Sequence, residues 1–146
     1  MIDHVLVVCE GNICRSPMAQ GILAHRLSQV SVISAGCGAL AGKAADPVAI
    51  ELMADRGIDI SKHVATDLNI EHASRSQLIL TMTQEQKKEI EKRYPFSKGR
   101  VFLYSAHDGE DVIDPYRKGR AVFETSLAQI ERGAGYWVDS INRLRK

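Results

Sequence analysis

Four short apolar runs divide the chain and predict β-strands. They cover residues 4–8, 30–34, 78–82 and 100–104. The runs at 4–8 and 78–82 are continuous, which is typical of strands buried on both faces of a sheet. The run at 30–34 alternates apolar and polar residues, as a half-buried strand does.

Between these runs, apolar residues recur at helical spacing after residues that favour a helix start. Helices are predicted at about 17–27, 47–56 and 84–94. A capping side chain precedes each of them: Ser16, Asp46 and Thr83. Such side chains accept hydrogen bonds from backbone N–H groups that the first helical turn leaves unpaired.

The C-terminal third contains a polar segment and one long amphipathic pattern. Residues 105–119 are polar and include Asp114-Pro115, so a loop is predicted there. Apolar residues at helical spacing predict a last helix over 123–144, with a bend near Gly133 and Gly135.

The alternation of strands and helices predicts an α/β fold. Its sheet is expected to have four parallel strands, with helices on both faces. The 146 residues suit a single domain spanning 1–146. Ligands of such sheets bind at the carboxyl ends of the strands, so the loop after the first strand is the first place to look for chemistry.

Composition excludes several classes of protein. A hydrophobic share of 45% argues against disorder, and a net charge of +1 argues against nucleic-acid binding by phosphate neutralisation. No apolar run approaches the roughly 20 residues of a membrane-spanning helix, so no membrane insertion is expected. The start lacks the basic and apolar regions of a signal peptide, which favours a cytoplasmic protein. Three cysteines are too few for a disulfide scaffold.

The loop at residues 9–16 combines a cysteine with the features of an anion site. Gly11 and Asn12 tolerate left-handed backbone angles, which allow successive N–H groups to converge on one point. The following helix N-terminus adds positive potential, and Arg15 supplies a planar fork of donors that matches phosphate. Both features favour the thiolate form of Cys9. The pattern predicts a phosphate loop with a nucleophile for attack on phosphorus.

Three other interpretations of this loop are weaker. Cys9 and Cys14 could be small buried apolar residues. Their spacing does not fit a zinc site, and no pair of histidines follows at metal-ligand spacing. The Gly-Lys-Ser/Thr of a nucleotide-binding loop is missing. No metal and no cofactor are therefore expected.

The chain resembles the low-molecular-weight protein tyrosine phosphatases. The resemblance rests on the stretch from Val7 to Ala19, VVCEGNICRSPMA, and on the later Asp114-Pro115-Tyr116. It implies hydrolysis of phosphotyrosine in proteins through a phosphocysteine intermediate.

The resemblance also implies a role for individual residues. Cys9 would be the nucleophile, Arg15 would hold the phosphoryl group, and Asp114 would act as general acid and then as base. The loop residues Glu10, Gly11, Asn12, Ile13, Cys14 and Ser16 would contact the substrate, with Leu40 and Tyr116 on either side of its ring. Ser34 and His63 would support the loop together with Asn12 and Ser16.

Leu40 stands where eukaryotic members of the family carry tryptophan. This resembles the bacterial subgroup associated with exopolysaccharide or capsule production. In that subgroup the partner is typically an autophosphorylating kinase with a tyrosine-rich tail. In the family, a cysteine placed like Cys14 can form a reversible disulfide with the nucleophile.

Two features make substrate recognition open to more than one interpretation. The family usually has an apolar residue at the position of Glu10. This carboxylate would repel phosphate if it faced the pocket, or select basic neighbours of phosphotyrosine if it lay at the rim. Arg117, Lys118 and Arg120 form a basic cluster near the predicted acid, which is either a solvated surface or an attractor of acidic peptides.

Two other functions compete with the phosphatase. An arsenate reductase of related fold needs further redox cysteines, and none follows Cys37. A phosphotyrosine-binding module without activity would not need Cys9, Arg15 and Asp114 together. Turnover of an aryl phosphate distinguishes both from a phosphatase.

Overall fold

A four-stranded parallel sheet forms the centre of the molecule. The structure is a computed structural model that describes residues 1–144. The strands are β1 (His4–Cys9), β2 (Ser31–Gly36), β3 (Leu78–Thr81) and β4 (Val101–Leu103). Their order across the sheet is β2-β1-β3-β4, and every neighbouring pair is parallel.

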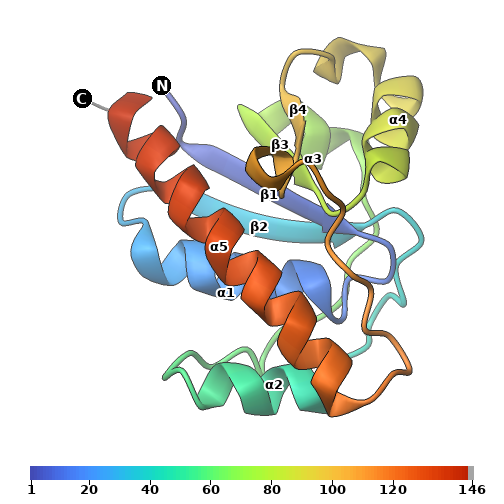
Figure 1. The fold of residues 1–146 in the computed structure, drawn as a ribbon. Coiled ribbons are helices and arrows are strands. Elements are labelled where there is room, and N and C mark those ends of the chain that lie inside the picture. Colours follow the sequence, from blue (N-terminus) through green and yellow to red (C-terminus); the bar gives the residue numbers. More distant parts are fainter. Residues whose placement is uncertain (145–146) are drawn as a thin grey trace.

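Helices cover both faces of this sheet (Figure 1). One face carries α1 (Arg15–Arg26), α2 (Pro47–Ala54) and α5 (Arg120–Leu144), and the other carries α3 (Ile70–Arg75) and α4 (Gln84–Arg93). Two short 3-10 turns, η1 (Pro95–Ser97) and η2 (Ala106–Asp108), flank β4. Among the described residues, none of the helices has the length and hydropathy that a membrane span requires.

The alternation of side chains along β1 divides the core into two layers. Val5 and Val7 belong to the cluster formed with α1, α2 and α5. Leu6 and Val8 belong to the opposite cluster, which includes Ile90 of α4. All four β1 side chains are fully buried. This confirms the prediction of a strand buried on both faces, because successive residues of a strand point to opposite sides.

The predicted fold class and most element positions are confirmed. The four strands and the four predicted helices lie within a few residues of their expected bounds. Asp46 caps α2 by accepting a hydrogen bond from the Val48 N–H at 2.9 Å. Thr83 and Gln86 form a reciprocal capping box at the start of α4.

The predicted cap of the first helix is wrong. Helix α1 begins at Arg15, and Cys14, the residue before it, makes no capping bond with its side chain. Ser16 lies inside the first turn, where its hydroxyl bonds the sulfur of Cys9 instead. The physical reason is that this helix start belongs to the loop, whose side chains bond one another.

Two further expectations differ from the structure. Helix α3 was not predicted, because it is only six residues long and largely polar. The expected bend in the last helix is absent, since α5 runs as one nearly straight helix through Gly133 and Gly135 (Figure 1). Gly133 serves close packing: a Cβ at this position would lie 2.3 Å from the Tyr104 ring.

The strand order places Cys9 at the point where the chain changes direction across the sheet. β1 lies in the interior, with β2 on one side and β3 on the other. The crevice outside such a switch point is where ligands of open parallel sheets bind. Cys9 ends β1 and therefore lies at this crevice.

Candidate active site

Hydrogen-bond donors from other segments bind the carbonyl groups of the loop after β1 and hold it in place. The carbonyls of residues 9–13 accept hydrogen bonds from Cys37 N (3.0 Å), Gly38 N (3.0 Å), Leu40 N (3.0 Å), His63 Nε2 (2.7 Å) and Asp46 N (2.8 Å). In a trans peptide the C=O and the following N–H point in opposite directions. The N–H groups of residues 10–14 therefore face the concave side of the loop, as an anion nest requires.

Asn12 makes the turn that this arrangement needs. Its φ is 59°, in the left-handed region, and its side chain is fully buried. Its Nδ2 donates to Ser16 Oγ at 2.7 Å and to Ser34 Oγ at 3.0 Å. Its Oδ1 accepts from the Thr66 N–H at 2.9 Å. Asn12 thus ties the loop to α1, to β2 and to the segment after α2.

The Cys9 sulfur lies 2.9 Å from Ser16 Oγ, and both side chains are buried. Because Ser16 Oγ already accepts a hydrogen bond from Asn12, its own proton is free to point at the sulfur. A hydrogen bond to a charged acceptor is stronger than one to a neutral acceptor. The arrangement therefore stabilises a thiolate at Cys9.

His63 and Ser34, which the resemblance gives a supporting role, both form hydrogen bonds with Asn12 of the loop. The Asn12 carbonyl can only accept, so the Nε2 of His63 carries the proton in their 2.7 Å hydrogen bond. Burial lowers the pKa of His63, and the bond to Asn12 partly opposes this effect. Ser34 accepts from Asn12 and donates to Oε1 of Gln20. The supporting shell is therefore a connected network.

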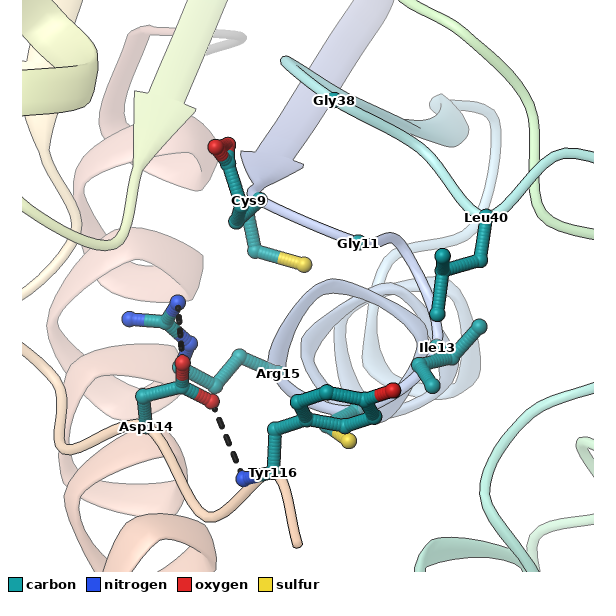
Figure 2. Close-up of a pocket in the computed structure, with 10 residues that line it drawn as sticks. Cys9, Gly11, Ile13, Arg15, Gly38, Leu40, Asp114 and Tyr116 are labelled. Carbon is teal, nitrogen blue, oxygen red and sulfur yellow. Dashed lines mark hydrogen bonds and ion pairs between the residues drawn. The ribbon is translucent and has the colours of Figure 1, made fainter.

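Arg15 links the loop to the predicted acid. Its side chain is 5% exposed, and its Nη1 donates to the Val112 carbonyl at 3.1 Å. Its Nη2 lies 3.6 Å from Oδ2 of Asp114, whose side chain is 52% exposed. Oδ1 of Asp114 accepts from the Tyr116 N–H at 3.0 Å. Figure 2 shows the Arg15–Asp114 and Asp114–Tyr116 contacts along one side of the pocket.

These residues enclose a cavity of about 140 Å³. Its lining consists of Cys9, Glu10, Gly11, Ile13, Cys14, Arg15, Gly38, Leu40, Asp114 and Tyr116. In Figure 2 the Cys9 sulfur points into the space between Arg15, Ile13 and Tyr116. Leu40 and Tyr116 lie at the mouth, 39% and 37% exposed. The cavity thus has a polar, anion-binding floor and an apolar rim.

Glu10 lies at the edge of this cavity. It is exposed, although it contributes to the lining. Its Oε1 would lie 3.5 Å from a Cβ added to Gly38, so the carboxylate sits beside the loop that follows β2. This position agrees with the rim interpretation of Glu10 rather than with a carboxylate on the cavity floor.

The remaining cysteines are free thiols in the structure. Cys14 is buried beside the cavity, and Cys37 is partly buried. Burial raises the pKa of both thiols, and Asp46 adds to the effect at Cys14. The thiol forms of Cys14 and Cys37 are therefore favoured at neutral pH. A disulfide between Cys9 and Cys14 stays a prediction.

The basic cluster is less free than the sequence indicated. Arg120 pairs with Glu51 at 2.8 Å and with Asp55 at 3.6 Å. The Arg117 guanidinium lies 5.2 Å from the centre of the Tyr116 ring, and Arg117 has a φ of 60°. These two arginines are therefore engaged within the molecule.

Sequence reasoning missed several residues of this site, among them Gly38, which lines the cavity. Val112 and Thr66 act through their backbone, which leaves no side-chain signature. Gln20 follows Ser16 by four residues on α1, so the helical spacing could have placed both on one face. Within residues 1–144, no group of three or more His, Cys, Asp or Glu side chains is arranged to hold a metal ion.

Comparison with known proteins identifies the family. Residues 4–146 match the family model described as low molecular weight phosphotyrosine protein phosphatase. The chain is 52% identical over 144 residues to the probable low molecular weight protein-tyrosine-phosphatase EpsP of Ralstonia solanacearum, covering 99% of each chain.

Two solved structures show the same fold. The tyrosine phosphatase Wzb from Escherichia coli K30, in complex with sulphate, is 30% identical with a TM-score of 0.93, covering 97% of this chain and 99% of the other. The YwlE arginine phosphatase from Geobacillus stearothermophilus is 29% identical with a TM-score of 0.91, covering 97% and 94%. The chain therefore belongs to the family of low molecular weight phosphotyrosine protein phosphatases.

Proposed function

We propose that this chain hydrolyses phosphotyrosine in proteins through a phosphocysteine formed on Cys9. The observation that carries the proposal is the position of the Cys9 sulfur. It lies 2.9 Å from Ser16 Oγ at the floor of a backbone nest, and Arg15 of the same loop lies 3.6 Å from Asp114. A nucleophile, an anion cradle and an acid thus meet in one cavity.

In the first step, the Cys9 thiolate attacks phosphorus in line with the leaving oxygen. The S–P bond forms while the bond between phosphorus and the tyrosine oxygen breaks. Asp114 gives its proton to the departing phenolate. The loop N–H groups and Arg15 hold the non-bridging oxygens, where negative charge is concentrated.

In the second step, water attacks the phosphorus of the phosphocysteine. Asp114, now ionised, accepts the proton of this water, and the S–P bond breaks to release inorganic phosphate. Cys9 leaves as a thiolate, which the Ser16 hydroxyl stabilises. The enzyme returns to its starting state with no other reactant than water.

The mouth of the cavity supports an aromatic leaving group. Leu40 and Tyr116 offer apolar and aromatic surface on different sides of the opening, and Ile13 lies between the two in the view of Figure 2. A tyrosine ring between such walls buries apolar area, whereas a short serine side chain would not.

A tyrosine-rich tail of an autophosphorylating kinase in exopolysaccharide control is the proposed physiological substrate. The occurrence of Leu40 in the loop after β2 supports this role. The whole-length similarity to EpsP and Wzb supports it as well.

Turnover of matched substrates tests the proposal. Wild type should hydrolyse p-nitrophenyl phosphate and a phosphotyrosine peptide, and should be much slower on phosphoserine and phosphoarginine versions of that peptide. Cys9→Ser should abolish turnover, whereas Cys37→Ser, a change outside the cavity, should retain it. Asp114→Asn should lower kcat/KM for the peptide by about 100-fold or more.

Three outcomes would contradict the proposal. Preference for the phosphoarginine peptide would assign the chain the activity of the Geobacillus neighbour. Binding of phosphotyrosine without turnover would make it a recognition module. Activity that survives in Cys9→Ser would exclude the phosphocysteine.

A further inference from the structure

Residues 110–114 form the segment that carries the proposed acid, here named the acid loop. The Val112 N–H donates to the Met82 carbonyl at 2.9 Å, which fastens the loop to the end of β3. The Asp111 carboxylate accepts from the Gln84 N–H at 3.0 Å, which fastens it to the start of α4. Both contacts lie upstream of Ile113, the residue directly before Asp114.

One side chain of α5, that of Gln129, contacts three residues of this loop. Oε1 of Gln129 accepts a hydrogen bond from the Ile113 N–H at 2.8 Å. Its Nε2 donates to Oε1 of Glu110 at 3.0 Å and to the Asp111 carbonyl at 3.4 Å. Gln129 is 6% exposed, so its own amide is largely removed from water, although its partners Glu110 and Ile113 are exposed. Each end of the amide therefore binds the acid loop.

The contacts leave only one orientation for the amide. The Ile113 N–H can only donate, so it must face the oxygen of Gln129. The Asp111 carbonyl can only accept, so it must face the nitrogen. A reversed amide would place two donors against each other on one side and two acceptors on the other.

This bond acts together with two others near Asp114: Arg15 donates to the Val112 carbonyl of the same peptide at 3.1 Å, and the Tyr116 N–H donates to Asp114 Oδ1 at 3.0 Å. The Asp114 side chain is half exposed and approaches Arg15 only to 3.6 Å. Asp114 directly follows Ile113 in the chain. Pro115, the next residue, restricts the Asp114 backbone to extended angles. Holding the Ile113 N–H thus fixes the Val112–Ile113 peptide, one residue before the Cα from which the Asp114 side chain projects. A general acid must be placed within hydrogen-bond reach of the leaving oxygen.

We propose that Gln129 is a positioning residue that aims Asp114 at the leaving-group oxygen. The proposal rests on the proposed role of Asp114 as general acid. On this proposal α5, which is far from the phosphate loop in the sequence, contributes to the catalytic arrangement, although Gln129 itself does not line the cavity.

Leaving-group dependence separates positioning from general stability. A nitrophenolate leaves readily without a proton, whereas unsubstituted phenolate needs one. The quantity to measure is the ratio of kcat/KM for p-nitrophenyl phosphate to kcat/KM for phenyl phosphate, because kcat/KM reports on phosphoryl transfer to the enzyme. Gln129→Met, which keeps the side-chain length but removes the amide, should raise this ratio about tenfold.

Two further variants complete the experiment. Asp114→Asn should raise the ratio more than Gln129→Met does. Thr125→Val, which removes a hydrogen bond within α5 one turn earlier, should leave the ratio unchanged. Should Gln129→Met fail to fold, Gln129→Leu takes its place, since it also removes both ends of the amide and with them the bond to Ile113.

The outcomes distinguish this proposal from the proposed function. An equal loss on both substrates, or no loss, in the folded Gln129 variant would overturn the positioning role while Asp114→Asn still raises the ratio. If Asp114→Asn also leaves the ratio unchanged, Asp114 is not the general acid, and the proposed function fails first.

Discussion

Asn12 is the residue on which the geometry of the phosphate loop depends most. It occupies a left-handed backbone position, and both ends of its amide are bonded inside the protein. Its backbone carbonyl receives the His63 bond as well. Backbone direction and side-chain contacts therefore act together at one position, and they can be separated by substitution.

Asn12→Gly keeps the left-handed angle and removes the side-chain bonds to Ser16, Ser34 and Thr66. It should lower the free energy of unfolding by about 2–3 kcal/mol, because buried polar groups lose their partners. Asn12→Ala should cost about 1 kcal/mol more, since a Cβ disfavours the left-handed region. Both variants should lose about 100-fold in kcat/KM as the loop shifts. Urea unfolding and p-nitrophenyl phosphate kinetics measure these effects. Equal stability of the two variants would contradict the claim that the left-handed backbone angle at residue 12 contributes to stability.

At the residue scale, the functions of site residues that are close together in the sequence were predictable. Contacts between residues that are far apart in the sequence were not. Cys9, Arg15 and Ser16 lie within eight residues of sequence, so their joint function was visible in the motif. Val112 joins the site through a carbonyl, and Gln129 joins it from another helix. Neither contact has a sequence pattern, because the first depends on how the acid loop packs against α1 and the second on how it packs against α5.

Among the elements, α5 shows most clearly how packing constrains the sequence. The Tyr104 ring is fully buried against Gly133, its hydroxyl donates to the Ile130 carbonyl at 2.8 Å, and its own carbonyl accepts from Trp137 Nε1 at 2.7 Å. The ring is therefore held in place and cannot easily move aside.

Gly133→Ala and Gly135→Ala form a matched pair on this helix. The added methyl of Gly133→Ala would meet the Tyr104 ring at 2.3 Å, and the variant should lose about 2 kcal/mol of stability through overpacking. At Gly135 the nearest atom is an Arg26 guanidinium nitrogen at 4.0 Å, so Gly135→Ala should gain up to about 1 kcal/mol from helix propensity. Thermal or urea unfolding measures both, and equal effects would contradict the packing account.

The spacing of apolar residues predicted the long helices and strands. Where each helix begins depends on the hydrogen bonds of the side chains near its first turn. Asp46 and Thr83 cap their helices as expected, because nothing competes for their side chains. Ser16 does not cap, because Cys9 and Asn12 bind its hydroxyl. The six-residue α3 is too short to show a helical period, although Asn69 caps it by accepting from the His72 N–H.

For the whole molecule, strand order decides where the loop lies. Alternating elements predict a parallel sheet, but right-handed crossovers alone allow several strand orders. The order β2-β1-β3-β4 follows from packing over the full chain, and it places Cys9 at the switch point. A net charge of +1 then means that phosphate affinity is concentrated in one loop rather than spread over a basic face.

Global stability should fall as the pH drops through the range in which histidine titrates. Burial lowers the pKa of His63 in the folded protein, so the unfolded chain takes up a proton first, near pH 6.5. The unfolded state is thereby favoured as the pH falls from about 7.5 to 5.5. His63→Gln should reduce this loss of unfolding free energy. It should not abolish the loss, because burial lowers the pKa of His72 as well.

Urea unfolding at the two pH values measures this effect. Replacing the exposed His25 with Gln provides a surface control for the effect of a His-to-Gln substitution itself. A His63→Gln variant with an undiminished pH dependence would show that the titration of His63 does not contribute.

Direct detection of the phosphoryl group on Cys9 tests the central claim. Wild-type enzyme turning over p-nitrophenyl phosphate is quenched rapidly, digested, and analysed by mass spectrometry for the peptide that contains residue 9. A phosphoryl group on the Cys9 sulfur during turnover, missing after substrate is exhausted and missing in Cys9→Ser, is the predicted result. Sustained turnover with the phosphoryl group on another residue, or on none, would contradict the account.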